Sequence, residues 1–142
     1  ATIFGTSSDY RLKENVTDIT DGITRVKQLS PKRFNFIADA DKKIDGFIAH
    51  EAQAVVPEAV TGTKDGMEDE EHEVAPAELD DNGKIVKESV MGTRSVPKMQ
   101  GIDQAKIVPL LTAALQEAIA KIETLESENT AIKARLDALE AE

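Results

Sequence analysis

VPLLTAALQEAIAKIETLESENTAIKARLDAL, residues 108–139, is the stretch that decides the fold of this chain. Within it, apolar residues recur at alternating steps of three and four, which is the spacing of a heptad repeat. The a positions are Val108, Leu115, Ile122, Asn129 and Leu136, and the d positions are Leu111, Ala118, Leu125, Ile132 and Leu139. These ten residues, called the seam below, predict one long helix with a continuous apolar edge.

The charged residues beside the seam indicate how the helix is used. In a parallel coiled coil, a g residue faces the e residue of the next heptad on the neighbouring helix. In this register Lys121 faces Glu126, Glu128 faces Lys133, and Arg135 faces Glu140. A single amphipathic helix packed on its own domain would explain the seam but not these three complementary pairs. We therefore predict a parallel oligomeric coiled coil.

Individual residues refine this prediction. Asn129 is the one polar a residue, and it would fix the register of the helices at some cost in stability. Ile132 at a d position, with leucine at a positions, favours a trimer over a dimer. Asp103 is a suitable N-cap, and Pro109 suits the first turns of a helix. We expect residues 103–142 to form the helix of a homotrimer.

Composition excludes several classes of protein. The 142 residues carry 27 acidic and 17 basic side chains, a net charge of −10, which argues against nucleic acid and anionic membrane surfaces as partners. Without cysteine there is no disulfide or thiol nucleophile. No run is long and apolar enough to cross a bilayer, and no glycine-rich phosphate loop is present, so we predict no membrane partner and no cofactor.

The part before the long helix predicts a small mixed body. In chain order we expect an extended piece at 1–7, a strand at 13–20, a short helix capped by Asp21, a strand at 33–37, a polar turn at 39–43, a strand at 46–49 and a helical turn at 51–56. Together with the long helix, these elements predict an α+β fold.

Residues 61–99 have a different character. They contain four glycines, two prolines and an acidic block at 68–73. We expect an extended, polar, solvent-facing excursion with little core of its own, turning at Asp81-Asn82-Gly83. His72 lies beside the acidic block, but a solvated run of charges explains that block better than a metal site, so no metal is predicted.

The pair Ser8 and Lys13 carries the candidate chemistry. A hydroxyl next to an amine is the simplest pairing of a nucleophile with a base. A spacing of five residues separates the two side chains by about 140° on a helix and places them on opposite faces of a strand. The two groups can therefore meet only if the chain bends between them.

Four segments in this order and spacing resemble the C-terminal intramolecular chaperone domain of bacteriophage tail fibres, tailspikes and endosialidases, a self-cleaving serine peptidase. The segments are SDYRLKENV (8–16), LSPKRFNF (29–36), GFIAHEAQ (46–53) followed by VPEAV (56–60), and ID (102–103) leading into IVPLL (107–111) and the heptads. The first and third segments are the most specific.

The resemblance implies a complete set of roles. Residues 1–7 are the end of an upstream fibre, 8–102 the chaperone and autoprotease body with the excursion at 61–99, and 103–142 the trimerisation helix. The domain trimerises, aligns the fibre chains for folding in the host cytoplasm during virion assembly, and then releases itself from the mature fibre. The scissile bond is Ser7–Ser8, with Ser8 as nucleophile and Lys13 as base.

The implied chemistry requires a neutral Lys13, which takes the proton of Ser8 and allows an ester to form that water then opens. The ordinary pKa of lysine is about 10.4, so a lysine base near neutrality needs a depression of about three units. Burial or the neighbouring Arg11 would lower the pKa of such a lysine, whereas Glu14 or Asp9 would raise it.

Two departures from the family pattern and two other readings stay open. His50 stands where glutamine is common, and Gln104 stands where tyrosine is common; neither position is in the Ser–Lys pair.

The chain could instead be a non-enzymatic trimerisation domain, with Ser8 and Lys13 incidental. It could also be a receptor-binding fibre tip, although its few aromatic residues fit carbohydrate binding poorly.

Overall fold

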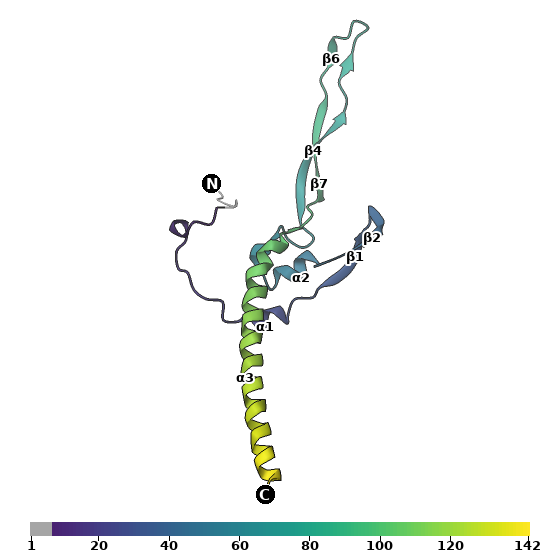
Figure 1. Ribbon diagram of the computed structural model, residues 1–142. Helices are drawn as coiled ribbons and strands as arrows, with labels where there is room; N and C mark the ends of the chain where they lie inside the picture. Colours follow the sequence, from purple (N-terminus) through teal and green to yellow (C-terminus); the bar gives the residue numbers. More distant parts are fainter. Residues whose placement is uncertain (1–6) are drawn as a thin grey trace. The chain divides into compact units, whose positions relative to one another are not determined.

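A computed structural model describes residues 7–142 and forms two compact units (Figure 1). The first unit combines the N-terminal segment through Lys27 with Pro109–Glu142, and the second is Gln28–Val108. The predicted mixture of helices and strands with a long C-terminal helix is confirmed. The predicted division by role, at 7/8 and 102/103, stays a prediction, and most of the expected extended piece at 1–7 lies outside the described residues.

The long helix predicted at 103–142 is confirmed as α3 (Val108–Glu140), which begins and ends inside the predicted range. It follows a short 3-10 turn, η3 (Gln104–Ile107), and the carboxylate of Asp103 caps that turn by accepting the Ala105 N–H at 3.1 Å. Pro109 lies at the start of α3, where its missing N–H is not needed. None of the helices within residues 7–142 has the length and hydrophobicity that a membrane-spanning segment requires.

The short helix α1 (Gly22–Val26) packs directly against α3 within the first unit. A Cβ atom on Gly22 would lie 2.6 Å from the backbone nitrogen of Ala114, so glycine allows the two backbones to touch. The Ile23 N–H donates to the Glu117 carboxylate at 3.0 Å. The contact thus rests on a hydrogen bond as well as on close approach.

Replacing Gly22 with alanine should separate α1 from α3. The added methyl group meets backbone atoms that cannot rotate away, so we expect a loss of about 1–3 kcal/mol, typical of overpacking. Hydrogen exchange at the Ile23 amide measures the effect, with Lys27→Ala as the control at an exposed position. Unchanged protection of the Ile23 amide in Gly22→Ala would contradict the described packing.

The second unit has a small apolar core. Its buried side chains are Ala52, Val55, Val56, Ala59, Val60 and Ile107. They come from α2 (Ala49–Gln53), η2 (Pro57–Ala59), β3 (Val60–Thr61), the loop between them and η3. Strand β3 pairs antiparallel with β8 (Gly101–Ile102), which brings η3 and its Ile107 to this core.

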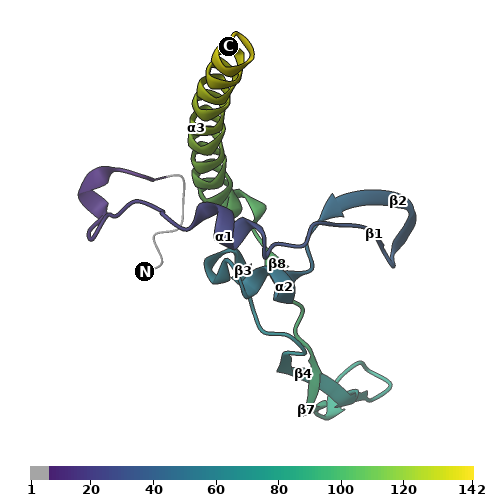
Figure 2. The same ribbon diagram turned by 90° about the horizontal axis from the view of Figure 1, so that it is seen from below.

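A hairpin of β1 (Lys32–Phe36) and β2 (Asp39–Gly46) extends from this unit (Figure 2). The strand predicted at 33–37 is confirmed, but the polar turn predicted at 39–43 and the strand predicted at 46–49 are wrong. The turn is at 37–38, because Phe36 pairs with Asp39. Charged residues therefore lie within β2, and Arg33 and Asp45 pair across the strands at 2.7 Å. Helix α2 then begins at Ala49, earlier than predicted.

The excursion at 61–99 is a long exposed hairpin, as predicted (Figure 1). Its strands are β4 (Met67–Ala75) with β7 (Val90–Pro97), and then β5 (Glu78–Leu79) with β6 (Ile85–Lys87). Gly83, with φ of +78°, lies in the predicted turn. The acidic block lies in β4, where Glu70 pairs with Arg94 at 2.9 Å and Glu68 with Lys98 at 3.1 Å.

The strand predicted at 13–20 is absent from the structure. These residues are exposed and have no partner strand, and Asn15 has a φ of +53°, which interrupts an extended run. The short helix predicted after Asp21 is confirmed, but it ends at Val26, and the predicted cap is wrong because the Asp21 side chain makes no capping hydrogen bond.

Candidate functional site

Ser8 and Lys13 meet in the first unit. The Lys13 Nζ donates a hydrogen bond to the Ser8 Oγ at 2.6 Å. The bend that this contact requires is a single 3-10 turn, η1 (Tyr10–Leu12), which lies between them. Two backbone hydrogen bonds close it, from the Leu12 N–H to the Asp9 carbonyl and from the Lys13 N–H to the Tyr10 carbonyl, both at 3.1 Å.

Asp9 organises this turn. Its carboxylate accepts the backbone N–H of Arg11 at 2.9 Å, which is the usual action of an N-cap. The same carboxylate receives two hydrogen bonds from the Arg11 guanidinium, at 2.8 and 2.9 Å. The guanidinium lowers the pKa of Asp9, and the carboxylate raises the pKa of Arg11.

The Asp9–Arg11 pair changes the predicted electrostatics of the site. The sequence suggested that Arg11 would favour a neutral Lys13 and that Asp9 would oppose it. In the structure the two charges pair with each other, so their effects on a nearby amine largely cancel.

The surroundings of the Ser8–Lys13 contact are open to solvent. Ser7, Ser8 and Lys13 are all exposed, and Ser7 lies beside a shallow hollow that Asp9 helps to line. Burial is the usual way to favour a neutral lysine, and the described residues of one chain do not bury this one. Tyr10 is also 81% exposed, a large apolar surface beside the pair.

The large apolar side chains of the seam of α3 are exposed in the single chain. The exposed fractions of its large apolar side chains run from 45% at Leu111 to 65% at Leu139. A different face of the same helix carries α1, with Leu110 and Ala114 buried and Glu117 bonded to Ile23. The packing of α1 therefore leaves the large apolar side chains of the seam exposed.

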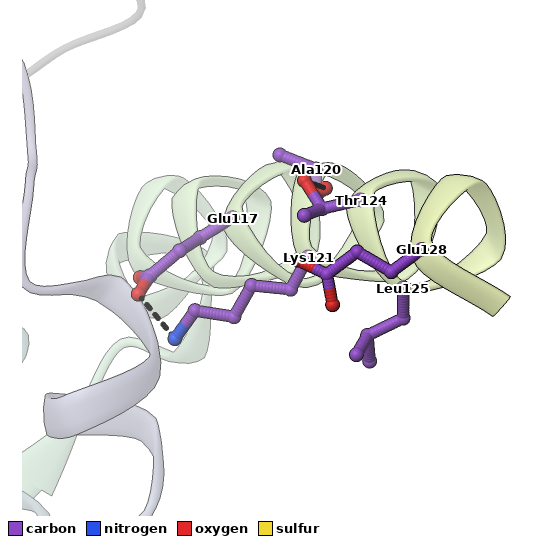
Figure 3. Close-up of a pocket in the computed structure, with 6 residues that line it drawn as sticks. All are labelled: Glu117, Ala120, Lys121, Thr124, Leu125 and Glu128. Atoms are coloured by element: carbon purple, nitrogen blue, oxygen red, sulfur yellow. Dashed lines mark hydrogen bonds and ion pairs between the residues drawn. The ribbon is translucent and has the colours of Figure 1, made fainter. Parts of the chain in front are cut away.

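One predicted charge has a partner within its own chain. Lys121 pairs with Glu117 one turn earlier on α3, at 3.2 Å, as Figure 3 shows. Both side chains lie at a hollow on the helix surface that Leu125 and Glu128 also line. The predicted pairing of Lys121 with Glu126 of a neighbouring helix stays a prediction.

The hydrogen bond between Ile23 and Glu117 should depend on pH. The Ile23 N–H and then Lys121 hold the pKa of Glu117 below its ordinary value of 4.5. Because the folded pKa is the lower one, the stabilisation is complete above about pH 4.5 and is lost as pH falls through the folded value. The Ile23 amide chemical shift should report this loss in wild type. Glu117→Gln, whose acceptor does not titrate, should remove the transition; a transition that persists in Glu117→Gln would assign it to another group.

The other residues noted in the sequence have structural surroundings. His50 lines an open hollow with Lys64, Lys98 and Gln100 in the second unit. The Gln104 side chain lies close to Gly46. His72 packs over Gly92, and its buried Nδ1 has no hydrogen-bond partner. Within residues 7–142, no three His, Asp or Glu side chains are grouped to hold a metal ion.

Sequence reasoning missed three features near the site. It did not identify Asp9 as the cap of a turn, although an aspartate ahead of a short helical turn is a recognisable signal. It did not identify Gly22 or Glu117 either, because their partners lie far away in the sequence. No local pattern could have shown those two contacts.

Comparison with known proteins agrees with the resemblance noted in the sequence. Residues 8–61 match a peptidase family described as chaperone of endosialidase. A solved structure of a "novel intramolecular chaperon" is similar to this chain at 17% identity and a TM-score of 0.46, over 80% of this chain and 99% of that one. No curated protein matches the sequence. The family match begins at Ser8 and confirms the predicted resemblance.

Proposed function

We propose that this chain, whose residues 8–61 match the chaperone of endosialidase family, is an intramolecular chaperone that trimerises, aligns a phage tail-fibre polypeptide and then cuts itself free between Ser7 and Ser8. The observation that carries the proposal is the 2.6 Å contact between the Lys13 Nζ and the Ser8 Oγ. It joins a nucleophile and a potential base at the first residue of the family match.

The cut proceeds through an ester. Neutral Lys13 accepts the proton of the Ser8 hydroxyl as its Oγ attacks the Ser7 carbonyl carbon. The Ser7–Ser8 C–N bond breaks, the proton passes to the new α-amino group of Ser8, and the Ser7 acyl group is left on the Ser8 Oγ. Water then hydrolyses this ester and restores the hydroxyl. The reaction takes place once, within one chain.

Assembly would supply the burial that Ser8 and Lys13 lack in the single chain. Ser8 and Lys13 are exposed to solvent in the single chain. Neighbouring chains or the upstream fibre would bury the contact and favour the neutral base. Cleavage would then report that three chains have assembled.

The chaperone action itself requires no chemistry. The exposed seam supports a parallel trimer, because aligned apolar side chains on one helix edge indicate an interaction surface. Three joined chains hold their upstream segments at high effective concentration and in register. Slow, non-local β pairing is the folding step that such alignment helps most. The exposed β4–β7 hairpin is the segment that would reach the upstream fibre.

Mass spectrometry tests the proposal directly. The chain expressed with its upstream polypeptide should yield a fragment that begins at Ser8, together with the released upstream part. A trimer that keeps its full covalent length under these conditions would contradict the autoproteolysis. It would leave the chain as a trimerisation domain.

A non-enzymatic trimerisation domain is the second candidate. The solvent exposure of Ser8 and Lys13 favours it, since an unburied pair gives no reason for an activated base. The same measurement separates the two candidates, because a trimerisation domain of this kind stays attached to its fibre.

A further inference from the structure

We propose that Asp9 is a positioning residue for the Ser8–Lys13 pair: its carboxylate holds the single turn that brings the two side chains together. The effect of Asp9 on cleavage rests on the proposed function. Its structural content, the dependence of the Ser8–Lys13 contact on Asp9, stands on the geometry alone.

The turn between the two residues needs support. It contains only Tyr10, Arg11 and Leu12, and none of them is buried. A single helical turn fixes several backbone dihedrals for few hydrogen bonds, so it does not persist in water without further interactions. Without this turn, the spacing of five keeps the Ser8 and Lys13 side chains apart.

Asp9 supplies the missing interactions from one side chain. Its Oδ1 accepts the Arg11 backbone N–H, which fixes the first residues of the turn. Its two oxygens also bind the Arg11 guanidinium side-on, which holds the side chain of the middle residue against the cap. The carboxylate therefore ties both the backbone and a side chain of the turn, immediately beside the nucleophile.

The two interactions can be separated by substitution. Asp9→Asn keeps an oxygen for the Arg11 N–H but loses the ion pair, and asparagine is as good an N-cap as aspartate. Arg11→Ala removes the ion pair and keeps the cap. Asp9→Ala removes both. If Asp9 acts by positioning, the first two variants should resemble wild type more closely than Asp9→Ala does.

The first measurement uses the isolated 142-residue chain and does not depend on cleavage. Nuclear Overhauser effects between the Ser8 Hβ and Lys13 Hε protons report the contact by NMR. They should be present in wild type, retained in Asp9→Asn and Arg11→Ala, and lost in Asp9→Ala. Asp18→Ala, at an exposed aspartate in the same segment, is the matched control and should retain them.

The second measurement follows cleavage with the upstream polypeptide attached. We expect Asp9→Ala to slow cleavage by about tenfold, the scale of a lost cap, and Asp9→Asn to recover most of the rate. In the double variant Asp9→Ala, Arg11→Ala, which removes both paired charges, the pH dependence of the remaining activity should keep its midpoint, since a positioning residue does not exchange protons with the substrate. Helix content and oligomer mass should match wild type in every variant.

The outcomes distinguish this inference from the proposed function. If wild type lacks the Ser8–Lys13 effects, or Asp9→Ala keeps them, the positioning role is overturned. If the double variant, which leaves no unpaired charge of this ion pair, shifts the midpoint of the pH profile, Asp9 does more than hold the turn and the positioning role is overturned. If the contact depends on Asp9 as expected but wild type does not cut, the proposed autoproteolysis fails and the positioning role stands.

Discussion

Replacing Ser8 with alanine should leave the bond to Ser7 uncut, while an attached fibre should still fold and trimerise. The substitution removes only one hydroxyl group, which lies on the surface and accepts a single hydrogen bond from Lys13. Loss of a nucleophile costs at least about a thousandfold in rate, because no other group can take its place. Denaturing electrophoresis and mass spectrometry should show a full-length chain. A product of wild-type size from Ser8→Ala would rule out Ser8 as the nucleophile.

Lys13 allows a sharper version of this test. Lys13→Met keeps much of the length of the side chain but cannot accept a proton, and we expect an equally complete loss of cleavage. Lys13→Arg keeps the positive charge and the ability to donate to Ser8, yet an arginine does not deprotonate in proteins. If Lys13 only orients Ser8, Lys13→Arg should still cleave. If Lys13 is the base, Lys13→Arg should not cleave.

Much of this site could be predicted from sequence, but its geometry could not. The motif at 8–16 identified Ser8 and Lys13, and the spacing showed that a bend must separate them. The bend depends on the Asp9 carboxylate. It accepts the backbone N–H of Arg11 and also binds the guanidinium of Arg11. A sequence shows that Asp9 and Arg11 are near each other, but not that they pair with each other instead of acting on Lys13.

The turn predicted at 39–43 is misplaced for a physical reason. A polar run at 39–43 predicted a turn, because charged residues are common in turns, yet these residues lie in a strand. Strand β2 is exposed, so its polarity does not distinguish it from a loop. What places the turn is the pairing of Phe36 with Asp39, a contact between segments rather than a local preference.

The long helix was predictable for the opposite reason. Its signal repeats every seven residues, so the seam remains identifiable even where single residues deviate. The second face of α3 was not predictable, since Leu110 and Ala114 fall outside the a and d positions and their burial becomes evident only in the folded chain. In the structure α3 thus contacts α1 on one face, while the large apolar side chains of the seam lie exposed on another.

The seam gives the second large prediction. Leu125→Asp combined with Ile132→Asp should convert a trimer into single chains, because each substitution places a carboxylate at a d position. Both side chains are more than 60% exposed in one chain. Their burial in a trimer would involve six side chains at about 1.5–3 kcal/mol each, so their loss costs at least about 9 kcal/mol per trimer. Sedimentation should show a threefold fall in mass.

Ser127→Asp with Ala134→Asp is the matched control. It adds the same two charges to the same part of α3, at f positions that face away from a coiled-coil partner, and the trimer should survive. A wild-type chain that sediments as a monomer would refute the coiled coil outright.

The monomeric Leu125→Asp, Ile132→Asp variant also tests whether cleavage requires assembly. If burial between chains makes Lys13 a base, the variant should not cut itself; if it cuts at the wild-type rate, a single chain activates Lys13 without any neighbour.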